Sequence, residues 1–137
     1  MSAEFVVRPI GRVVSGLVDP ATAPKQGDEG APDADLVFDP AVRPGLADVG
    51  VGDVLLVLTW LHRAQRDVLA VHPRDDERLP LRGVFSTRSA DRPNPIGLHR
   101  VEVLSVDGAT VRVRGLEAIA GTPVVDVKSV LGAIHER

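Results

Sequence analysis

The side chains best suited to chemistry lie in one stretch, residues 83–100, which reads GVFSTRSADRPNPIGLHR. Arg88, Arg92 and Asn94 fall within it, and a proline stands on each side of the asparagine. A proline fixes its own φ angle and drives the preceding residue away from helical geometry, so Arg92 and Asn94 should be extended, with side chains on opposite sides. Guanidinium groups on a stiff backbone suit an anionic or polar ligand. A proline-braced turn with solvated arginines explains the same residues equally well.

Positive charge is concentrated at this stretch, although the formal net charge of the chain is −3 at pH 7. Residues 82–100 hold four arginines and one aspartate, a net charge of +3, whereas residues 1–50 hold eight acidic and four basic residues, a net charge of −4. The overall balance argues against a general polyanion binder. A local cationic patch nevertheless attracts RNA more than the total charge indicates.

The composition predicts one domain, residues 1–137, with a core of its own, because the chain has 137 residues of which 44% are hydrophobic. Aromatic residues are only 3%, so valine, leucine, isoleucine and alanine must fill that core, and abundant valine favours strands. The absence of cysteine excludes disulfides and thiolate chemistry, which suits the cytoplasm. The longest apolar run, residues 54–61, is far too short to span a bilayer as a helix.

The elements that must position the polar residues are predicted to be short strands, since no stretch has the periodicity of a three-turn amphipathic helix. A continuously apolar run at 53–62 predicts a central strand covered on both faces, and Asp107-Gly108 between alternating segments predicts a hairpin. Further strands are expected at 5–14 with a bulge at Gly11, and at 34–39, 67–73 and 123–131, with a long loop at 16–35 and a turn at 42–53. In the hairpin Val101, Val103, Val111 and Val113 should face the core, and Glu102, Arg112 and Arg114 should face solvent. Regularly spaced short strands predict an all-β fold, a small antiparallel closed β-barrel with long loops.

The remaining polar residues give weaker signals. His62 ends the central strand and is either a hydrogen-bonded structural histidine or part of a pocket at the barrel mouth. Asp126 and Lys128 lie two residues apart on one strand and so face the same side, as a surface ion pair or as the lining of a site. No metal site is expected, because the four histidines lack the spacing of metal ligands. A Ser-His-Asp triad can be assembled on paper, but no nucleophile elbow supports it.

Several of these segments resemble the TsaA-like proteins, known as TrmO in bacteria. FSTRSADRPNPIG at 85–97 is similar to the family signature almost throughout. The other similar segments are IGRVVSG at 10–16, APKQG at 23–27, VLLVLTWLHRAQ at 54–65 and GLEAIAGTPVVDVKSVL at 115–131. This chain has Glu117 and Ala120 where the family pattern has aspartate, and Ser129-Val130 where it has Pro-Tyr. We expect a short member, without the extra C-terminal domain of many bacterial members.

The resemblance implies a β-barrel homodimer that holds S-adenosylmethionine near the dimer interface. The family methylates N6 of adenine 37, a base bearing a threonylcarbamoyl group, so the anticodon loop of tRNA is the expected partner, with no metal and no membrane. By motif position, the implied cofactor contacts are Gln26, Gly27, His62, Arg63, Arg88, Leu98, Arg114, Gly115, Leu116 and Glu117.

The reaction itself suggests catalytic roles for four more residues. The acceptor nitrogen is delocalised into a carbonyl, so a nearby base should help to remove its proton, and Asp126 is the candidate. Lys128, Arg92 and Asn94 are candidates to hold the oxygens of the modification. Two alternatives stay open: methylation of a small-molecule acceptor, and a non-catalytic module that binds the cofactor or RNA.

Overall fold

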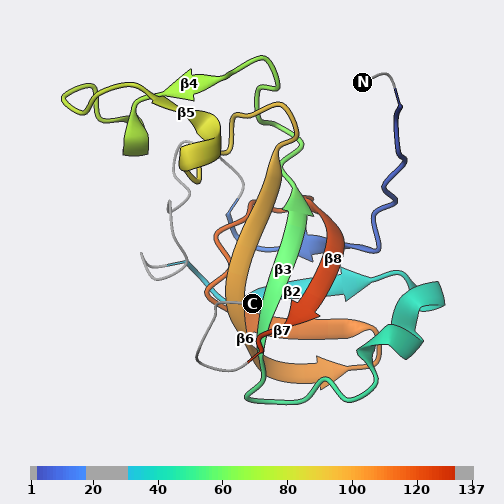
Figure 1. Cartoon of the computed structure of the whole chain (residues 1–137). Coiled ribbons are helices and arrows are strands. Elements are labelled where there is room, and N and C mark those ends of the chain that lie inside the picture. Colours follow the sequence, from blue (N-terminus) through green and yellow to red (C-terminus); the bar gives the residue numbers. More distant parts are fainter. Residues whose placement is uncertain (1–2, 18–30, 132–137) are drawn as a thin grey trace.

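The protein is described here by a computed structural model, which covers residues 3–17 and 31–131. Within these residues, six strands form a closed antiparallel barrel, and a two-stranded sheet lies beyond one end of it (Figure 1). The order around the barrel is β1 (Gly11–Val14), β2 (Ala34–Phe38), β7 (Thr110–Arg114), β6 (Ile96–Asp107), β3 (Val54–Trp60) and β8 (Pro123–Ser129). The small sheet pairs β4 (Ala70–Val71) with β5 (Arg82–Gly83). The predicted all-β fold is therefore confirmed.

Short 3-10 turns connect some of these strands. They are η1 (Pro40–Leu46), η2 (Pro73–Asp75) and η3 (Val84–Ser86). The first begins at Asp39, whose side chain accepts a hydrogen bond from the Ala41 amide, and it corresponds to the turn predicted at 42–53. Among the described residues no helix is long and apolar enough to cross a membrane.

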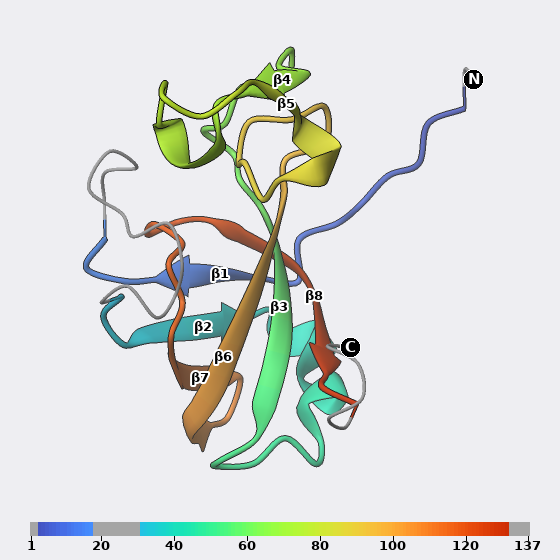
Figure 2. The same cartoon turned by 60° about the vertical axis from the view of Figure 1, so that its left-hand side comes forward.

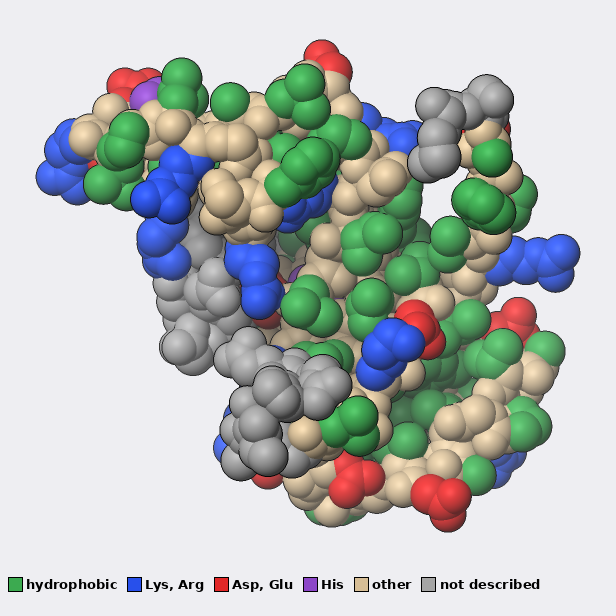
Figure 3. All heavy atoms as spheres, in the orientation of Figure 1, with side chains coloured by type: hydrophobic (Ala, Val, Ile, Leu, Met, Phe, Trp, Pro, Cys, Tyr) green, Lys and Arg blue, Asp and Glu red, His purple; other side chains and the backbone are tan. Residues whose placement is uncertain are grey.

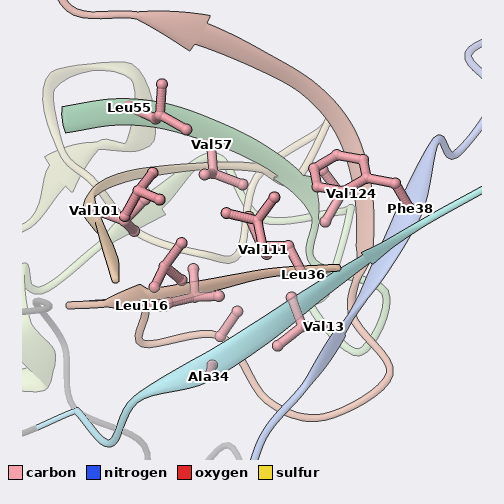
Figure 4. Close-up of a cluster of buried hydrophobic side chains, with 13 residues drawn as sticks. Val13, Ala34, Leu36, Phe38, Leu55, Val57, Val101, Val111, Leu116 and Val124 are labelled. Carbon is pink, nitrogen blue, oxygen red and sulfur yellow. The ribbon is translucent and has the colours of Figure 1, made fainter. Parts of the chain in front are cut away.

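Alternating side chains fill the inside of the barrel with aliphatic residues (Figure 4). Val101 and Val103 of β6 and Val111 and Val113 of β7 are each at most 1% exposed, as their alternation predicted. The two strands meet at the predicted hairpin, where Asp107 pairs with Thr110 and Gly108 has a φ angle of 61°. On the outside Arg114 pairs with Glu102 and Arg112 with Asp35.

The continuously apolar run at 53–62 forms β3, which pairs with both β6 and β8, so its central position is confirmed. Its burial was mispredicted. Leu55, Val57 and Thr59 are buried, but the residues between them are only half-buried, because within residues 3–17 and 31–131 no second layer covers the outside of the barrel at β3. Because β3 is apolar on both faces and only its inner face is covered, its outer face forms an apolar surface.

Two other strand predictions were too long. The segment 67–73 contributes only β4, which pairs with β5 outside the barrel. In 5–14 only Gly11–Val14 is a strand, and the residues before it run away from the barrel with Phe5 91% exposed (Figure 2). Pro9 has no amide hydrogen to donate to a neighbouring strand. Gly11 is not a bulge, since β1 and β2 pair in regular register; a Cβ there would lie 2.7 Å from the Val37 carbonyl oxygen.

Candidate functional site

A cavity of about 730 Å³ lies where the end of the barrel meets the small sheet and residues 85–97, here called the signature loop. Its wall comes from residues 61–64, 71–75, 79–82, 86–92, 96–99 and 117–122, with gaps. Figure 3 shows this side of the molecule hollowed below the small sheet, with cationic side chains, coloured blue, near the opening. The volume is in the range of pockets that enclose a cofactor-sized ligand.

Six of the residues predicted to form the site line this cavity. They are His62, Arg63, Arg88, Arg92, Leu98 and Glu117. They come from three separated segments: the chain after β3, the signature loop with the start of β6, and the chain after β7. The barrel therefore brings together residues that the sequence places far apart. Gln26 and Gly27 lie outside the described residues.

Arg92 does not point its guanidinium at open cavity. Its Nη2 donates to the carbonyl oxygen of Val84 at 2.6 Å, and its Nη1 donates to the carbonyl oxygens of Ser89 at 3.1 Å and Thr87 at 3.3 Å. The expected contact of Arg92 to substrate oxygens stays a prediction, and the structure gives this side chain a further role. This side chain holds residues 84–92 in a closed loop, because one guanidinium satisfies several carbonyls at once.

The loop is also fixed to the chain after β3. The Asp91 carboxylate accepts a hydrogen bond from the Gln65 amide at 2.8 Å, and the Arg92 amide donates to the Gln65 carbonyl at 3.0 Å. These bonds carry His62 and Arg63 to the same wall as Arg88. The arginine-rich stretch is thus a built wall of a pocket, which favours the ligand-site alternative over the solvated turn.

Asn94 faces away from the cavity. Its Oδ1 accepts a hydrogen bond from Arg66 Nη2 at 3.2 Å, and Arg66 Nε donates to the carbonyl oxygen of Pro93 at 2.9 Å. The Arg66 guanidinium lies 5.1 Å from the centre of the Trp60 ring, a cation–π distance. Arg92 and Asn94 therefore serve different surfaces, as the two prolines predicted, and the structure places Asn94 beside Trp60 on the outside.

Asp126 and Lys128 form an ion pair of 3.3 Å on the outer face of β8. Neither lines the cavity. The register places Leu58 of β3 between Asp126 and the cavity residue Leu98, so Asp126 is two strand spacings, roughly 10 Å, from Leu98. The two residues share a face, as their spacing predicted.

At the end of β7 only Glu117 reaches the cavity. Leu116 is fully buried in the core, and the Arg114 side chain is 63% exposed beside Glu102. Gly115 between them has a φ angle of 93°, which turns the chain so that residues 114–117 face different directions. The motif assigns all four residues to one site together, so it could not predict that their side chains diverge.

His99 belongs to this site although no sequence motif pointed to it. It is 4% exposed; its Nδ1 lies 2.6 Å from Glu117 Oε1, and its Nε2 lies 2.6 Å from Thr59 Oγ1. A carboxylate only accepts, so Nδ1 donates to Glu117 and, in the neutral ring, Nε2 accepts from the Thr59 hydroxyl. The signal was available: the alternation that buries Val101 and Val103 puts residue 99 on the same inner face.

This arrangement has the bonding order of a hydrolase triad, with a hydroxyl, an imidazole and a carboxylate in sequence. It cannot act as one. The Thr59 side chain is 0% exposed, so no substrate can approach the hydroxyl. The accessible end is the carboxylate, since Glu117 lines the cavity with 17% of its side chain exposed.

Charges around the opening are mainly cationic. Arg63, Arg74, Arg82 and Arg88 line it, with Asp75, Asp91 and Glu117 as the acids. Beside it the Arg78 guanidinium donates to the Asp76 carboxylate, which lowers the pKa of Asp76 and raises that of Arg78. Both groups are exposed to water, so this pair contributes little to stability. Among the described residues no three potential metal ligands cluster together.

The chain is thus a small closed antiparallel β-barrel with a cation-rimmed cavity at one end. More specifically, the chain belongs to the tRNA-methyltransferase O N-terminal domain family, whose model matches residues 13–135. The resemblance noted from the signature loop is thus confirmed.

Curated relatives carry names that refer to a cofactor. A "Probable S-adenosyl-L-methionine-binding protein" of Archaeoglobus fulgidus is 43% identical over 122 residues, which are 89% of this chain and 33% of that protein. One of Methanothermobacter thermautotrophicus with the same name is 41% identical over 125 residues, covering 91% of this chain and 89% of the relative. The chain thus spans about a third of the first relative and most of the second.

A solved structure shares the fold. The crystal structure of TrmO from Pseudomonas aeruginosa superposes with a TM-score of 0.75 at 24% sequence identity. The match covers 94% of this chain and 57% of that one. The barrel described above therefore has the same fold as the matching part of that larger protein.

Proposed function

We propose that this protein is an S-adenosylmethionine-dependent methyltransferase that acts on N6 of threonylcarbamoyl-adenosine at position 37 of tRNA. Family membership and the names of the relatives support the cofactor and the reaction class. The observation that carries the proposal is the pocket, in which the family signature loop forms a wall with arginines at the rim and a carboxylate inside. Such a function places the protein with tRNA in the cytoplasm.

The residues present fit the cofactor. S-adenosylmethionine has a carboxylate, which suits guanidinium groups such as Arg63 and Arg88. Its hydroxyl and amine groups suit an acceptor such as Glu117, and its adenine suits the apolar wall of Leu61, Ile96 and Leu98. The cavity of about 730 Å³ has room for a ligand of this size.

When bound, the cofactor supplies a methyl group on a sulfonium, which is already activated for displacement. The protein's task is then to hold two reactants in line and to manage one proton. Arg88 and Glu117 orient the donor from two separate segments of the wall, and the closed loop of residues 84–92 keeps water out. Asp126 and Lys128 lie outside the cavity, so we assign them to the acceptor: Asp126 accepts the proton of N6, and Lys128 meets an oxygen of the modification.

Asp126→Asn should lower the rate of methyl transfer about a hundredfold and leave cofactor affinity unchanged, because the amide keeps the shape but cannot take a proton. Single-turnover transfer and calorimetry measure the two quantities. The matched control is Asp35→Asn, which removes a similar exposed ion-pair carboxylate, that to Arg112, at a remote strand. Loss of cofactor affinity in Asp126→Asn would move this residue to the cofactor site.

The acceptor is tested by transfer of labelled methyl groups to three pools: tRNA with the threonylcarbamoyl modification, tRNA lacking it, and a small-molecule extract. Label on the modified tRNA alone is the expected result. Label in the small-molecule pool would replace the acceptor, and cofactor binding without transfer to any pool would make the protein a binding module.

The outer face of β3 and β6 supports the proposal of a homodimer. Half-buried or exposed apolar side chains pair across these strands, Leu58 with Leu98 and Trp60 with Ile96, and Leu56 extends the row. Apolar side chains that are not covered by other described residues suit contact with an identical face. Ile96 and Leu98 also line the cavity, so a second copy here would lie beside the pocket.

Leu56→Glu should convert a dimer to a monomer, because a carboxylate would replace an apolar side chain in the proposed interface. The barrel should stay folded, because the new carboxylate would lie beside Arg100 and Lys128, its partners in register. Light scattering during gel filtration measures the mass. Val51→Glu, at a turn residue 73% exposed, is the control and should leave the mass unchanged. A monomeric wild type at tens of micromolar, or a dimeric Leu56→Glu, would contradict the proposed interface.

A further inference from the structure

The floor of the pocket contains a buried hydrogen-bond chain, Thr59–His99–Glu117, that crosses the end of the barrel. Thr59 lies on β3, His99 on β6, and Glu117 on the chain after β7. Both bonds are 2.6 Å long, and both His99 nitrogens are used. In a buried setting each bond fixes its partners more firmly than it would in water.

The barrel has a notch for this chain at Gly97, which faces Thr59 directly in the β3–β6 register. A Cβ at position 97 would lie 2.5 Å from Thr59 Oγ1 and 2.7 Å from His99 Nε2. Only a residue without a side chain lets the imidazole lie against its own strand and reach the threonine. The chain is therefore a specific local construction rather than a chance contact.

Exposure falls along the chain from the pocket inward. The Glu117 side chain is 17% exposed and lines the cavity, His99 is 4% exposed, and Thr59 is fully buried. A ligand in the cavity can thus meet the carboxylate, while the threonine serves only the imidazole. His99 acts between them: the Glu117 carboxylate, which only accepts, sets its tautomer, and the Thr59 hydroxyl holds the ring in place.

We propose that His99 is a positioning residue that holds the Glu117 carboxylate as a fixed hydrogen-bond acceptor for a hydroxyl or amine group of the bound ligand. The inference rests on the proposed function for the identity of that ligand, S-adenosylmethionine. A carboxylate already held by an imidazole loses little rotamer freedom when the ligand binds, so its bond contributes more to affinity. Arginines at the rim and a fixed carboxylate at the floor together select a ligand with an acidic group and hydrogen-bond donors.

The test is calorimetric titration with S-adenosylhomocysteine, which carries the same hydroxyl and amine groups. His99→Leu removes the bond to Glu117 and should weaken binding about tenfold, the effect of one hydrogen bond to a charged group. His99→Asn keeps an N–H near the position of Nδ1 and should restore most of the affinity. Thr110→Val, at a strand position away from the pocket, is the control and should bind like the wild type.

A double-mutant cycle separates positioning from direct contact. Glu117→Gln alone should weaken binding about tenfold, and adding His99→Leu should weaken it no further, because His99 acts only through the carboxylate. If His99→Leu does not fold, as judged by thermal unfolding, Thr59→Val takes its place with an expected loss of about threefold.

The outcomes distinguish the inference from the proposed function. If the wild type does not bind S-adenosylhomocysteine or S-adenosylmethionine, the proposed function fails and this inference with it. If the wild type binds but the His99 variants bind equally well, or if the effects of positions 99 and 117 add, only the role of His99 is overturned.

Discussion

Arg92→Ala should abolish saturable binding of S-adenosylhomocysteine and open the loop of residues 84–92. The guanidinium is the shared donor for the carbonyls of Val84, Thr87 and Ser89, so its removal leaves them without that partner. We expect a loss of about 2–4 kcal/mol in local stability, from several charge-assisted bonds in a part-buried place. Because this loop forms one wall of the pocket, opening the loop should also disrupt the ligand-binding site.

Amide hydrogen exchange measures the opening, and calorimetry measures the binding. Arg92→Lys should fail almost as completely, since one ammonium cannot spread donors over the same set of carbonyls. Arg112→Ala, which removes a remote guanidinium paired with Asp35, is the control for loss of an arginine and should keep both properties. If Arg92→Ala lost binding while exchange at 84–92 stayed slow, Arg92 would be a direct ligand contact after all.

Gly97→Ala has the second largest expected effect, since one methyl group would occupy the notch described above. The added Cβ forces apart Thr59 Oγ1 and His99 Nε2, which lie only 2.5 and 2.7 Å from its position. The Thr59 hydroxyl belongs to a short β-branched side chain on a central strand and has little room to move. Overpacking and a broken buried hydrogen bond together should cost about 2–4 kcal/mol.

Urea unfolding measures that loss, and titration with S-adenosylhomocysteine should show weakened binding in the protein that remains folded. Gly45→Ala provides the matched control. A Cβ at residue 45 meets nothing within 4 Å, so the same substitution should change the stability by less than about 1 kcal/mol. Equal stability of the two variants would show that the notch is not needed.

Much of the barrel could be predicted from the sequence, because local patterns determine its hairpin turn and which side chains face inward. The hairpin at Asp107-Gly108 and the inward valines at 101, 103, 111 and 113 follow from turn chemistry and a period of two. The same alternation places His99 on the inner face, although no role was predicted for this residue from the sequence. The burial of β3 was overpredicted, because an apolar sequence does not say whether anything covers its second face.

The candidate site was predicted only in part, and the physical reason differs from residue to residue. Arg88, His62 and Glu117, which motif position grouped together, line one cavity, and their role as cofactor contacts stays a prediction. The role of Arg92 in closing the loop was not predicted, since the sequence shows a guanidinium but not which carbonyls the loop turns toward it. For Asp126 the sequence left a surface ion pair and the lining of a site open, and the structure shows the ion pair with Lys128 on the outer face of β8.

By itself, the sequence determined the class of fold, the family and the loop that forms a wall of the cavity, because strand alternation, glycine turns and prolines act within a few residues. Only the tertiary structure decided which polar groups meet. The bonds from Thr59 to His99 and from His99 to Glu117 join residues 40 and 18 positions apart. The pairing of β6 with β3 on one side and with β7 on the other brings them within hydrogen-bond distance, and no local pattern encodes the pairing of β3 with β6 over some 40 positions.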